Sequence, residues 1–117
     1  MIKKITSLML VSAALALLTV SPASAGLQDF TLQNRTGYEI YYVYVSPKRS
    51  NQWGNDVLGE SQTLPTGYDV EIYVNGYADN VCAFDIKAVD EDEDVYITTA
   101  NLCTQTNVEI NINHLQQ

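Results

Sequence analysis

Hydrophobic and polar residues alternate with a period of two along four segments of the chain. The most regular segment is 107–113, where valine and isoleucine alternate with asparagine and glutamate. The other three segments are 29–33, 69–74 and 82–88. This period places one face of a β-strand on a core and the other face in water. No segment after residue 25 has an apolar stripe at 3.6-residue spacing, so the pattern predicts an all-β fold.

Two further segments, 38–46 and 95–102, are apolar on both faces. Strands that are covered on both sides, or that carry a bulge that switches the buried face, have this pattern. Turn signals separate the segments at 36–37, 65–67, 75–76 and 90–94. Six or seven short strands at this spacing predict a small antiparallel two-sheet sandwich, with a small closed β-barrel as the alternative.

The first 25 residues have the features of a secretory signal peptide. Lys3 and Lys4 precede an apolar run from 5 to 20, and Ala23-Ser24-Ala25 matches a cleavage site. A transmembrane anchor is the alternative, but it needs about 20 apolar residues, and serines and a proline interrupt this run. We therefore expect cleavage after Ala25 and export to the periplasm or the exterior of a bacterial cell. The mature protein would be one domain, 26–117, with a flexible tail after about residue 113.

Two cysteines, Cys82 and Cys103, lie 21 positions apart in the part of the chain expected to be exported. A domain this small buries little more than ~60% of its unfolded surface, and an oxidising compartment permits disulfides. We therefore interpret the pair as a structural bridge that contributes about 3 kcal/mol. A redox pair or a metal site is the alternative, but there is no C-x-x-C motif and the one histidine, His114, lies in the tail. The bridge would tie the open ends of the hairpin that turns at 90–94, or join the two sheets.

The charge of the mature domain excludes some partners. Without the signal peptide, 4 basic and 14 acidic side chains remain, which gives a formal net charge of −10. Such a surface repels nucleic acid and anionic lipid headgroups. We therefore expect the domain to bind neither nucleic acid nor, after signal cleavage, a membrane. We also expect it to be a monomer. Cations or basic partners would be attracted, although the same charge also serves solubility alone.

The acidic segment 90–94 is a candidate metal site. Asp90, Asp92 and Asp94 have the spacing of the first three ligands of a calcium loop. The match ends there, because the loop pattern requires glycine at the sixth position and glutamate at the twelfth, and this chain has Val95 and Asn101. The alternative is a solvated hairpin tip whose charges discourage pairing with another strand edge. No other cofactor is indicated.

Aromatic residues suggest a contact surface. The mature chain has eight tyrosines, two phenylalanines and one tryptophan. Tyr42 and Tyr44, together with Trp53 and the neighbouring Asp56, could stack on a sugar ring or a protein partner. The alternative is that these tyrosines lie on a sheet face without any ligand, as strand tyrosines often do.

Catalytic motifs are missing from the sequence. There is no G-x-S-x-G or H-E-x-x-H. A carboxylate pair such as Asp56 and Asp85 could in principle hydrolyse a glycoside, but a sandwich of this size leaves little room for the cleft. We therefore predict that the protein is not an enzyme. The sequon Asn34-Arg35-Thr36 is discounted because the signal peptide is of the bacterial kind.

Several motifs occur in an order that resembles a known family. They are FTLQNRTGYEI, YVSP, WGNDVLG, LPTG, CAFDIKAV and NLC, which together extend over most of 30–103. On these motifs the chain resembles a family of small secreted bacterial proteins, one domain long, whose function is uncharacterised. Some relatives are labelled argininosuccinate lyase, a large helical tetramer that a chain of this size could not form.

The resemblance implies a β-rich fold with Cys82 paired to Cys103. The chain departs from the family at Phe84, where relatives tend to have tryptophan, and at 90–94, where an Asp-Gly turn is common.

The segment WGNDVLG, residues 53–59, is expected to form a compact loop over the open end of the sandwich. Trp53 and Leu58 would fill the gap, while the two glycines permit a tight backbone. Asp56 would accept hydrogen bonds from loop N–H groups. In the alternative, Trp53 is a platform for a ligand.

These observations favour an exported, non-enzymatic β-sandwich that acts by surface binding to a protein or glycan partner. The alternative function is a calcium-stabilised extracytoplasmic module that uses the acidic tip 90–94.

Overall fold

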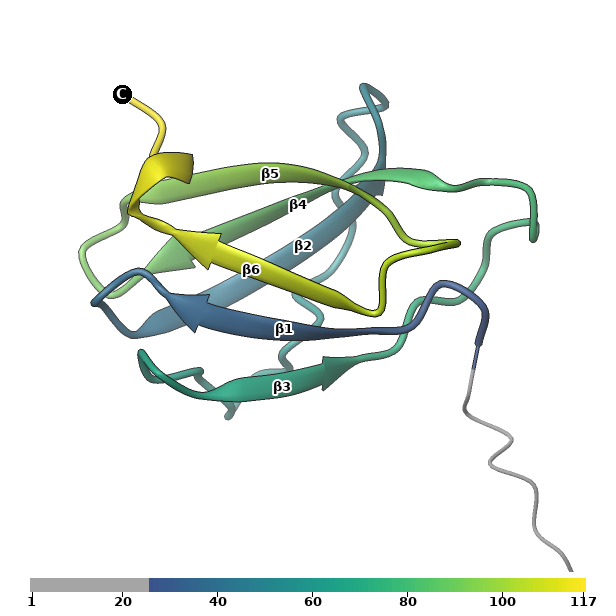
Figure 1. The fold of residues 1–117 in the computed structure, drawn as a ribbon. Helices are drawn as coiled ribbons and strands as arrows, with labels where there is room; N and C mark the ends of the chain where they lie inside the picture. The colour runs from purple at the N-terminus through teal and green to yellow at the C-terminus, as the bar shows by residue number, and fades with distance from the viewer. Residues whose placement is uncertain (1–25) are drawn as a thin grey trace, which may run out of the picture.

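Six strands are present in the computed structural model, which describes residues 26–117 (Figure 1). They are β1 (Phe30–Arg35), β2 (Ile40–Pro47), β3 (Asp69–Ile72), β4 (Ala83–Asp90), β5 (Val95–Asn101) and β6 (Asn107–Asn111), followed by a short 3-10 turn, η2 (Ile112–His114). The predicted signal peptide and its cleavage site, residues 1–25, lie outside the described residues. Within 26–117, no helix is long and apolar enough to cross a membrane.

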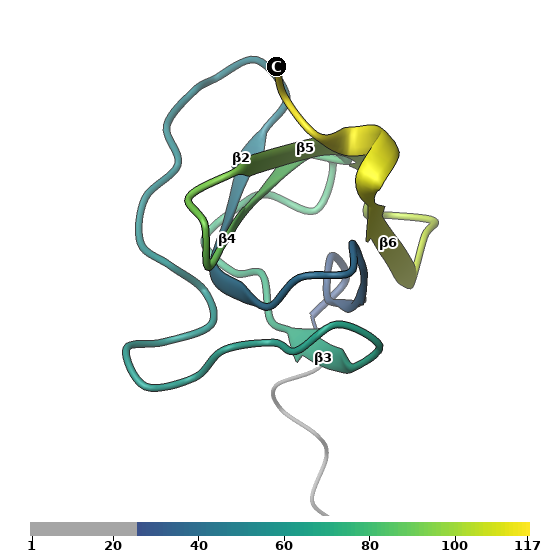
Figure 2. The same ribbon diagram turned by 90° about the vertical axis from the view of Figure 1, so that its left-hand side faces the viewer.

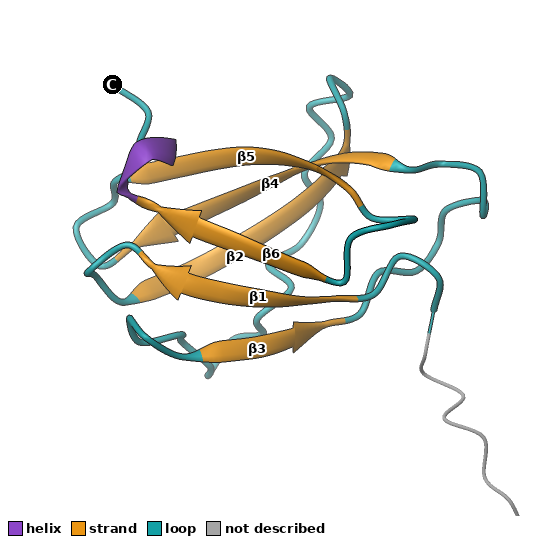
Figure 3. Ribbon diagram, in the orientation of Figure 1, coloured by secondary structure: helices purple, strands orange, loops and turns teal. Residues whose placement is uncertain are grey.

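The strands form two three-stranded sheets, in the orders β3-β1-β6 and β2-β4-β5 (Figure 3). The predicted all-β two-sheet sandwich is therefore confirmed, and the sheets do not close into the alternative barrel. Three of the four strand pairs are antiparallel, but β1 and β6 run parallel. This pair is the one departure from the predicted antiparallel pairing among the described strands. These are the first and last strands, so no hairpin turn constrains their relative direction.

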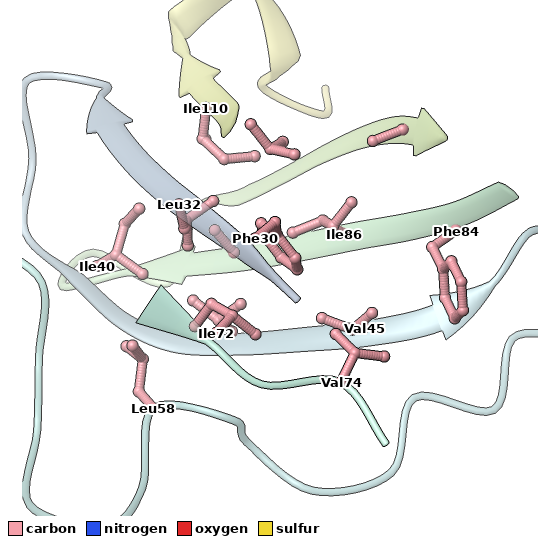
Figure 4. Packing of buried hydrophobic residues seen from close by; sticks show 14 of the residues in the cluster. Phe30, Leu32, Ile40, Val45, Leu58, Ile72, Val74, Phe84, Ile86 and Ile110 are labelled. Carbon is pink, nitrogen blue, oxygen red and sulfur yellow. The ribbon is translucent and has the colours of Figure 1, made fainter. Parts of the chain in front are cut away.

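The alternating residues fill the space between the two sheets. Phe30, Leu32 and Ile72 from one sheet lie opposite Val45 and Ile86 from the other (Figure 4). Among residues 26–117, the buried core consists of Phe30, Leu32, Ile40, Val43, Val45, Leu58, Leu64, Ile72, Val74, Phe84, Ile86, Ala88, Tyr96, Ala100, Leu102, Val108 and Ile110. A period of two thus decided which side chains point inward, because successive strand residues face opposite sides of a sheet.

The apolar character of both faces of β2 has a local cause. The pairing of β2 with β4 shifts register between Ile40 and Tyr42, which is a β-bulge. Ile40 and Val43 are both buried, while Tyr41 and Tyr42 are both exposed. The extra residue switches the side that faces the core, as one of the two sequence interpretations required.

The disulfide joins Cys82, which precedes β4, to Cys103, which follows β5. The bridge therefore ties the open ends of the β4–β5 hairpin within one sheet, and the alternative of a bridge between sheets was wrong. The Leu102 N–H donates to the Cys82 carbonyl at 2.8 Å, so the bridge extends a ladder that is already paired. A structural disulfide is typical of proteins in oxidising compartments.

Two segments cover the outer edges of the β2-β4-β5 sheet. The long connection 48–68 passes along β2 (Figure 2), where the Val57 N–H donates to the Val43 carbonyl at 2.8 Å. At the opposite edge, where the sequence indicated a flexible tail, Leu115 forms a bridge with Tyr96 of β5. The edge positions that these segments occupy are closed to pairing with another chain.

The turn η2 fixes the start of the C-terminal segment. The Asn111 N–H donates to Nδ1 of His114 at 3.0 Å, and the Asn111 side chain accepts from the Asn113 N–H. The one histidine thus serves as part of a capping box.

Candidate binding surface

The side of the β2-β4-β5 sheet that faces away from the core carries aromatic and aliphatic residues. Cross-strand register places two rows on this side, Tyr42–Val89–Val95 and Tyr44–Lys87–Ile97. We call these six residues the outer face. Tyr42 is 46% exposed and the other five are half-buried. Side chains opposite one another on neighbouring strands are close enough to interact, so the outer face is one continuous surface.

Lys87 connects this face with the loop that follows β2. Its Nζ lies 4.7 Å from the centre of the Trp53 ring and 5.1 Å from the centre of the Tyr44 ring. Cations over aromatic faces at such distances are attracted by the ring quadrupole. Among residues 26–117 the ion pair found is Arg35–Asp69, so the two rings are the partners of the Lys87 charge. Sequence reasoning missed Lys87, although its place on the polar side of 82–88 was a usable signal.

Of the two residues expected to form a lid, Leu58 reaches the core and Trp53 does not. Leu58 is 6% exposed and belongs to the core (Figure 4). Trp53 is half-buried and packs over Lys87 instead of the core. The sole tryptophan therefore lies at the border of the outer face, which explains its place in a polar loop.

Asp56 holds the loop against β2. Its Oδ1 accepts from the Val43 N–H of β2 at 2.9 Å and from the Leu58 N–H at 3.0 Å, so one of the two donors is a loop N–H, as predicted. Gly54 and Gly59 have φ of 69° and 92°, in the left-handed region that glycine adopts without steric cost. The hydrogen bonds of Asp56 thus fix the middle of the loop, and the glycines permit the backbone conformation on either side of it.

Two hollows flank this loop. The first has a volume of about 320 Å³ and lies between the loop and the segment after β3; it is lined by Val45, Trp53, Gly54, Asn55, Val57, Tyr73, Val74, Asn75 and Tyr77. The second has a volume of about 580 Å³ and is lined by Tyr42, Tyr44, Asn55, Asp56, Gly59 and Glu60. Three of the four predicted contact residues therefore line one hollow. Trp53 lines the first hollow, and its ring and the Tyr44 ring both contact the Lys87 ammonium group.

The acidic tip contains a buried carboxylate that supports the turn. Asp90 is 1% exposed, and its Oδ1 accepts from the backbone N–H groups of Asp92 and Asp94 at 2.9 and 3.0 Å. Its Oδ2 accepts from the Tyr96 hydroxyl at 2.8 Å. Ligand oxygens of the three aspartates lie within 4.8 Å of one another, but both oxygens of Asp90 already have protein donors. These contacts favour a hairpin cap over a calcium site.

Burial raises the pKa of Tyr96 above its ordinary value, and the hydrogen bond to Asp90 raises it further. The folded protein therefore retains the phenol proton at a pH where the unfolded chain, with a tyrosine pKa near 10, loses it. The free energy of unfolding should keep its full value below about pH 10. Above that pH it should fall by up to about 1.4 kcal/mol per pH unit.

Urea denaturation between pH 8 and pH 11.5 would measure this loss. The Tyr96→Phe variant has no such proton. We expect its free energy of unfolding to be lower than that of the wild type at pH 8 but nearly independent of pH above 10. Parallel curves for the two proteins would contradict the assignment to Tyr96.

Asn34, the first residue of the discounted sequon, has no exposed surface. Its Nδ2 donates to the carbonyls of Tyr38 and Leu64, each at 2.8 Å. Its Oδ1 accepts from the N–H and the hydroxyl of Thr36 at 3.0 and 2.7 Å. A side chain with all these partners joins the β1–β2 turn to the connection before β3, and it is closed to a glycan.

The remaining carboxylate that the sequence offered for catalysis, Asp85, is also engaged. Its Oδ1 accepts from the Thr99 hydroxyl at 2.7 Å and its Oδ2 from the Arg49 N–H at 3.1 Å.

Comparison with protein-family models, curated proteins and solved structures gives no match to this chain, so the family resemblance drawn from its motifs stays a prediction.

Proposed function

We propose that this protein is an exported, non-enzymatic β-sandwich domain that binds a protein or glycan partner through the outer face and the adjoining loop. The observation that carries the proposal is the contact of Lys87 with the Tyr44 and Trp53 rings beside the exposed Tyr42, on the side of the sheet that faces away from the core. Aromatic rings with a polar tip are enriched at contact surfaces, because they bury a large area and retain a hydrogen-bonding group.

The engagement of the candidate catalytic groups supports a non-catalytic role. His114 accepts a backbone N–H as part of a cap. Asp56 and Asp85 hold loop backbone groups, and Asp85 also accepts from a threonine hydroxyl. A general base must be free to take a proton from a substrate, so these contacts argue against each of them in that role.

The disulfide supports the proposed location outside the cytosol. Disulfides persist in the periplasm and outside the cell, and glutathione and thioredoxin keep most cytosolic thiols reduced. The bridge between Cys82 and Cys103 therefore agrees with export to one of these compartments by the predicted signal peptide.

Binding through the outer face predicts a loss of affinity in Tyr42→Ser. The partner would first be found with a glycan panel and with a periplasmic extract passed over the immobilised domain, and its affinity would then be measured. We expect a loss of about tenfold, because removing a central aromatic contact typically costs more than 1 kcal/mol.

Tyr68→Ser is the matched control, since Tyr68 is 64% exposed but lies just before β3, away from the outer face. An equal loss in both variants, or none in Tyr42→Ser, would contradict the proposed surface.

A further inference from the structure

The second hollow combines two aromatic rings with two carboxylates. Tyr42 and Tyr44 come from one face of β2, so their Cα atoms lie roughly 7 Å apart. Asp56 and Glu60 contribute acidic groups from the loop. The volume of about 580 Å³ lies in the range typical of sites for small groups, roughly 300 to 1,000 Å³.

No cation of the described chain forms an ion pair with these carboxylates. The ion pair found in residues 26–117 is Arg35–Asp69, which involves neither Asp56 nor Glu60. Oδ1 of Asp56 accepts two backbone N–H groups, whereas no donor from the described residues bonds to its Oδ2. Asp56 is half-buried, and a charge that is partly removed from water attracts a counter-charge more strongly than an exposed one.

The aromatic wall of the hollow already interacts with a cation in this structure. Tyr44 has the ammonium of Lys87 at 5.1 Å from its ring centre. A second ring, Tyr42, is oriented by an edge-on contact with Tyr41, with centroids 6.4 Å apart. Rings of this kind bind ammonium and guanidinium groups, and nearby carboxylates add a direct ionic attraction.

The charge of the whole domain selects the same kind of ligand. Residues 26–117 carry 14 acidic and 4 basic side chains, so the domain attracts a basic partner and repels an anionic one. A neutral glycan would use the rings and could donate hydroxyl groups to the carboxylates, but only a cationic group adds an ionic attraction to them.

From these observations we propose that the hollow formed by Tyr42, Tyr44, Asp56 and Glu60 binds a lysine or arginine side chain of a basic protein segment. The inference rests on the proposed function and narrows its partner from protein or glycan to a basic protein. The cationic head would lie against the rings with the carboxylates beside it, and flanking basic residues would be steered by the acidic surface.

A titration with a hexalysine peptide at 150 mM salt tests the inference, with Trp53 fluorescence and calorimetry as readouts. Trp53 is the one tryptophan in the chain and lies two positions before Asn55, which lines the hollow. At this salt concentration charges farther away than about 8 Å are largely screened. We expect saturable binding that Glu60→Gln weakens by about fivefold or more and Tyr42→Ser by a similar factor.

Two matched variants separate the hollow from general charge attraction. Asp79→Asn removes the same charge from an exposed residue near the disulfide, and we expect it to change the affinity by less than about twofold. Tyr68→Ser removes an exposed ring elsewhere and should also have little effect. Equal effects of Glu60→Gln and Asp79→Asn, or no binding of hexalysine, would overturn the inference.

Other probes distinguish this inference from the proposed function. Spermidine binding as tightly as hexalysine would overturn the assignment to a protein segment, because a free amine would then suffice. If a neutral glycan binds with dependence on Tyr42 and hexalysine does not bind, the surface proposal stands and the basic partner is wrong. If neither a glycan nor a protein depends on Tyr42, both fail.

Discussion

Replacing Cys82 and Cys103 together with alanine is expected to lower the free energy of unfolding by about 3 kcal/mol. The bridge closes a loop between residues 21 positions apart, and removing it returns conformational freedom to the unfolded chain. The folded state should change little, because the Leu102 N–H still bonds to the Cys82 carbonyl and β4 still pairs with β5. Small domains have total stabilities of about 5 to 15 kcal/mol, so this is a large share.

Urea denaturation followed by Trp53 fluorescence would measure the loss. Wild-type protein kept reduced is the matched control and should unfold at nearly the same urea concentration as the double variant. If the free energy of unfolding of the double variant lies within about 1 kcal/mol of that of the oxidised wild type, the disulfide does not contribute the expected share of the stability.

Asp90→Ala is expected to cost about 3 kcal/mol of stability. The substitution removes the acceptor of the buried Tyr96 hydroxyl and of the Asp92 and Asp94 N–H groups. Hydrogen bonds to a charged acceptor are stronger than neutral ones, and a buried donor left without an acceptor loses its solvation as well. The measurement is the same urea denaturation, at neutral pH.

Two variants at the same tip serve as controls. Asp90→Asn keeps one oxygen for the two N–H groups and offers an amide to the tyrosine hydroxyl, so we expect less than half the loss. Asp92→Ala removes an exposed carboxylate and should change stability by less than about 0.5 kcal/mol. Equal losses in Asp92→Ala and Asp90→Ala would contradict the cap.

The acidic tip also permits a direct test of the calcium alternative. An extracellular site with a dissociation constant of about 0.1 to 1 mM would add roughly 1.4 to 2.7 kcal/mol of stability at 10 mM calcium. Because both oxygens of Asp90 have protein donors, we expect no such gain. A gain that disappears in the Asp92→Asn/Asp94→Asn variant, with Asp90 intact, would support the calcium-stabilised module instead.

Much of the fold could be predicted because the relevant pattern is local. In 82–88 the alternation alone shows that Phe84 and Ile86 face the core while Asp85 and Lys87 face outward, and β4 has this arrangement. The relative direction of β1 and β6 could not be predicted in this way. It depends on how two segments at opposite ends of the domain meet, and no turn residue records that choice.

The candidate site, too, was predicted from the sequence only in part. Tyr42 and Tyr44 were named as contact candidates from the sequence, and they share a face because they are two positions apart on one strand. The contact of Lys87 with Tyr44 and Trp53 was missed, since it requires the register of β4 on β2 and the path of the loop. The burial of Asp90 was also missed, because a run of acidic residues ordinarily indicates a solvated turn.

The sequence by itself determined the all-β class, the inward residues of most strands and the role of the two cysteines. Each depends on spacing within a few residues or, for the cysteines, on residue chemistry. Only the tertiary structure decided which edges are covered, which carboxylate is buried and which rings surround Lys87. These features arise where distant segments pack together, and the free energy of such packing depends on contacts that no short stretch of sequence contains.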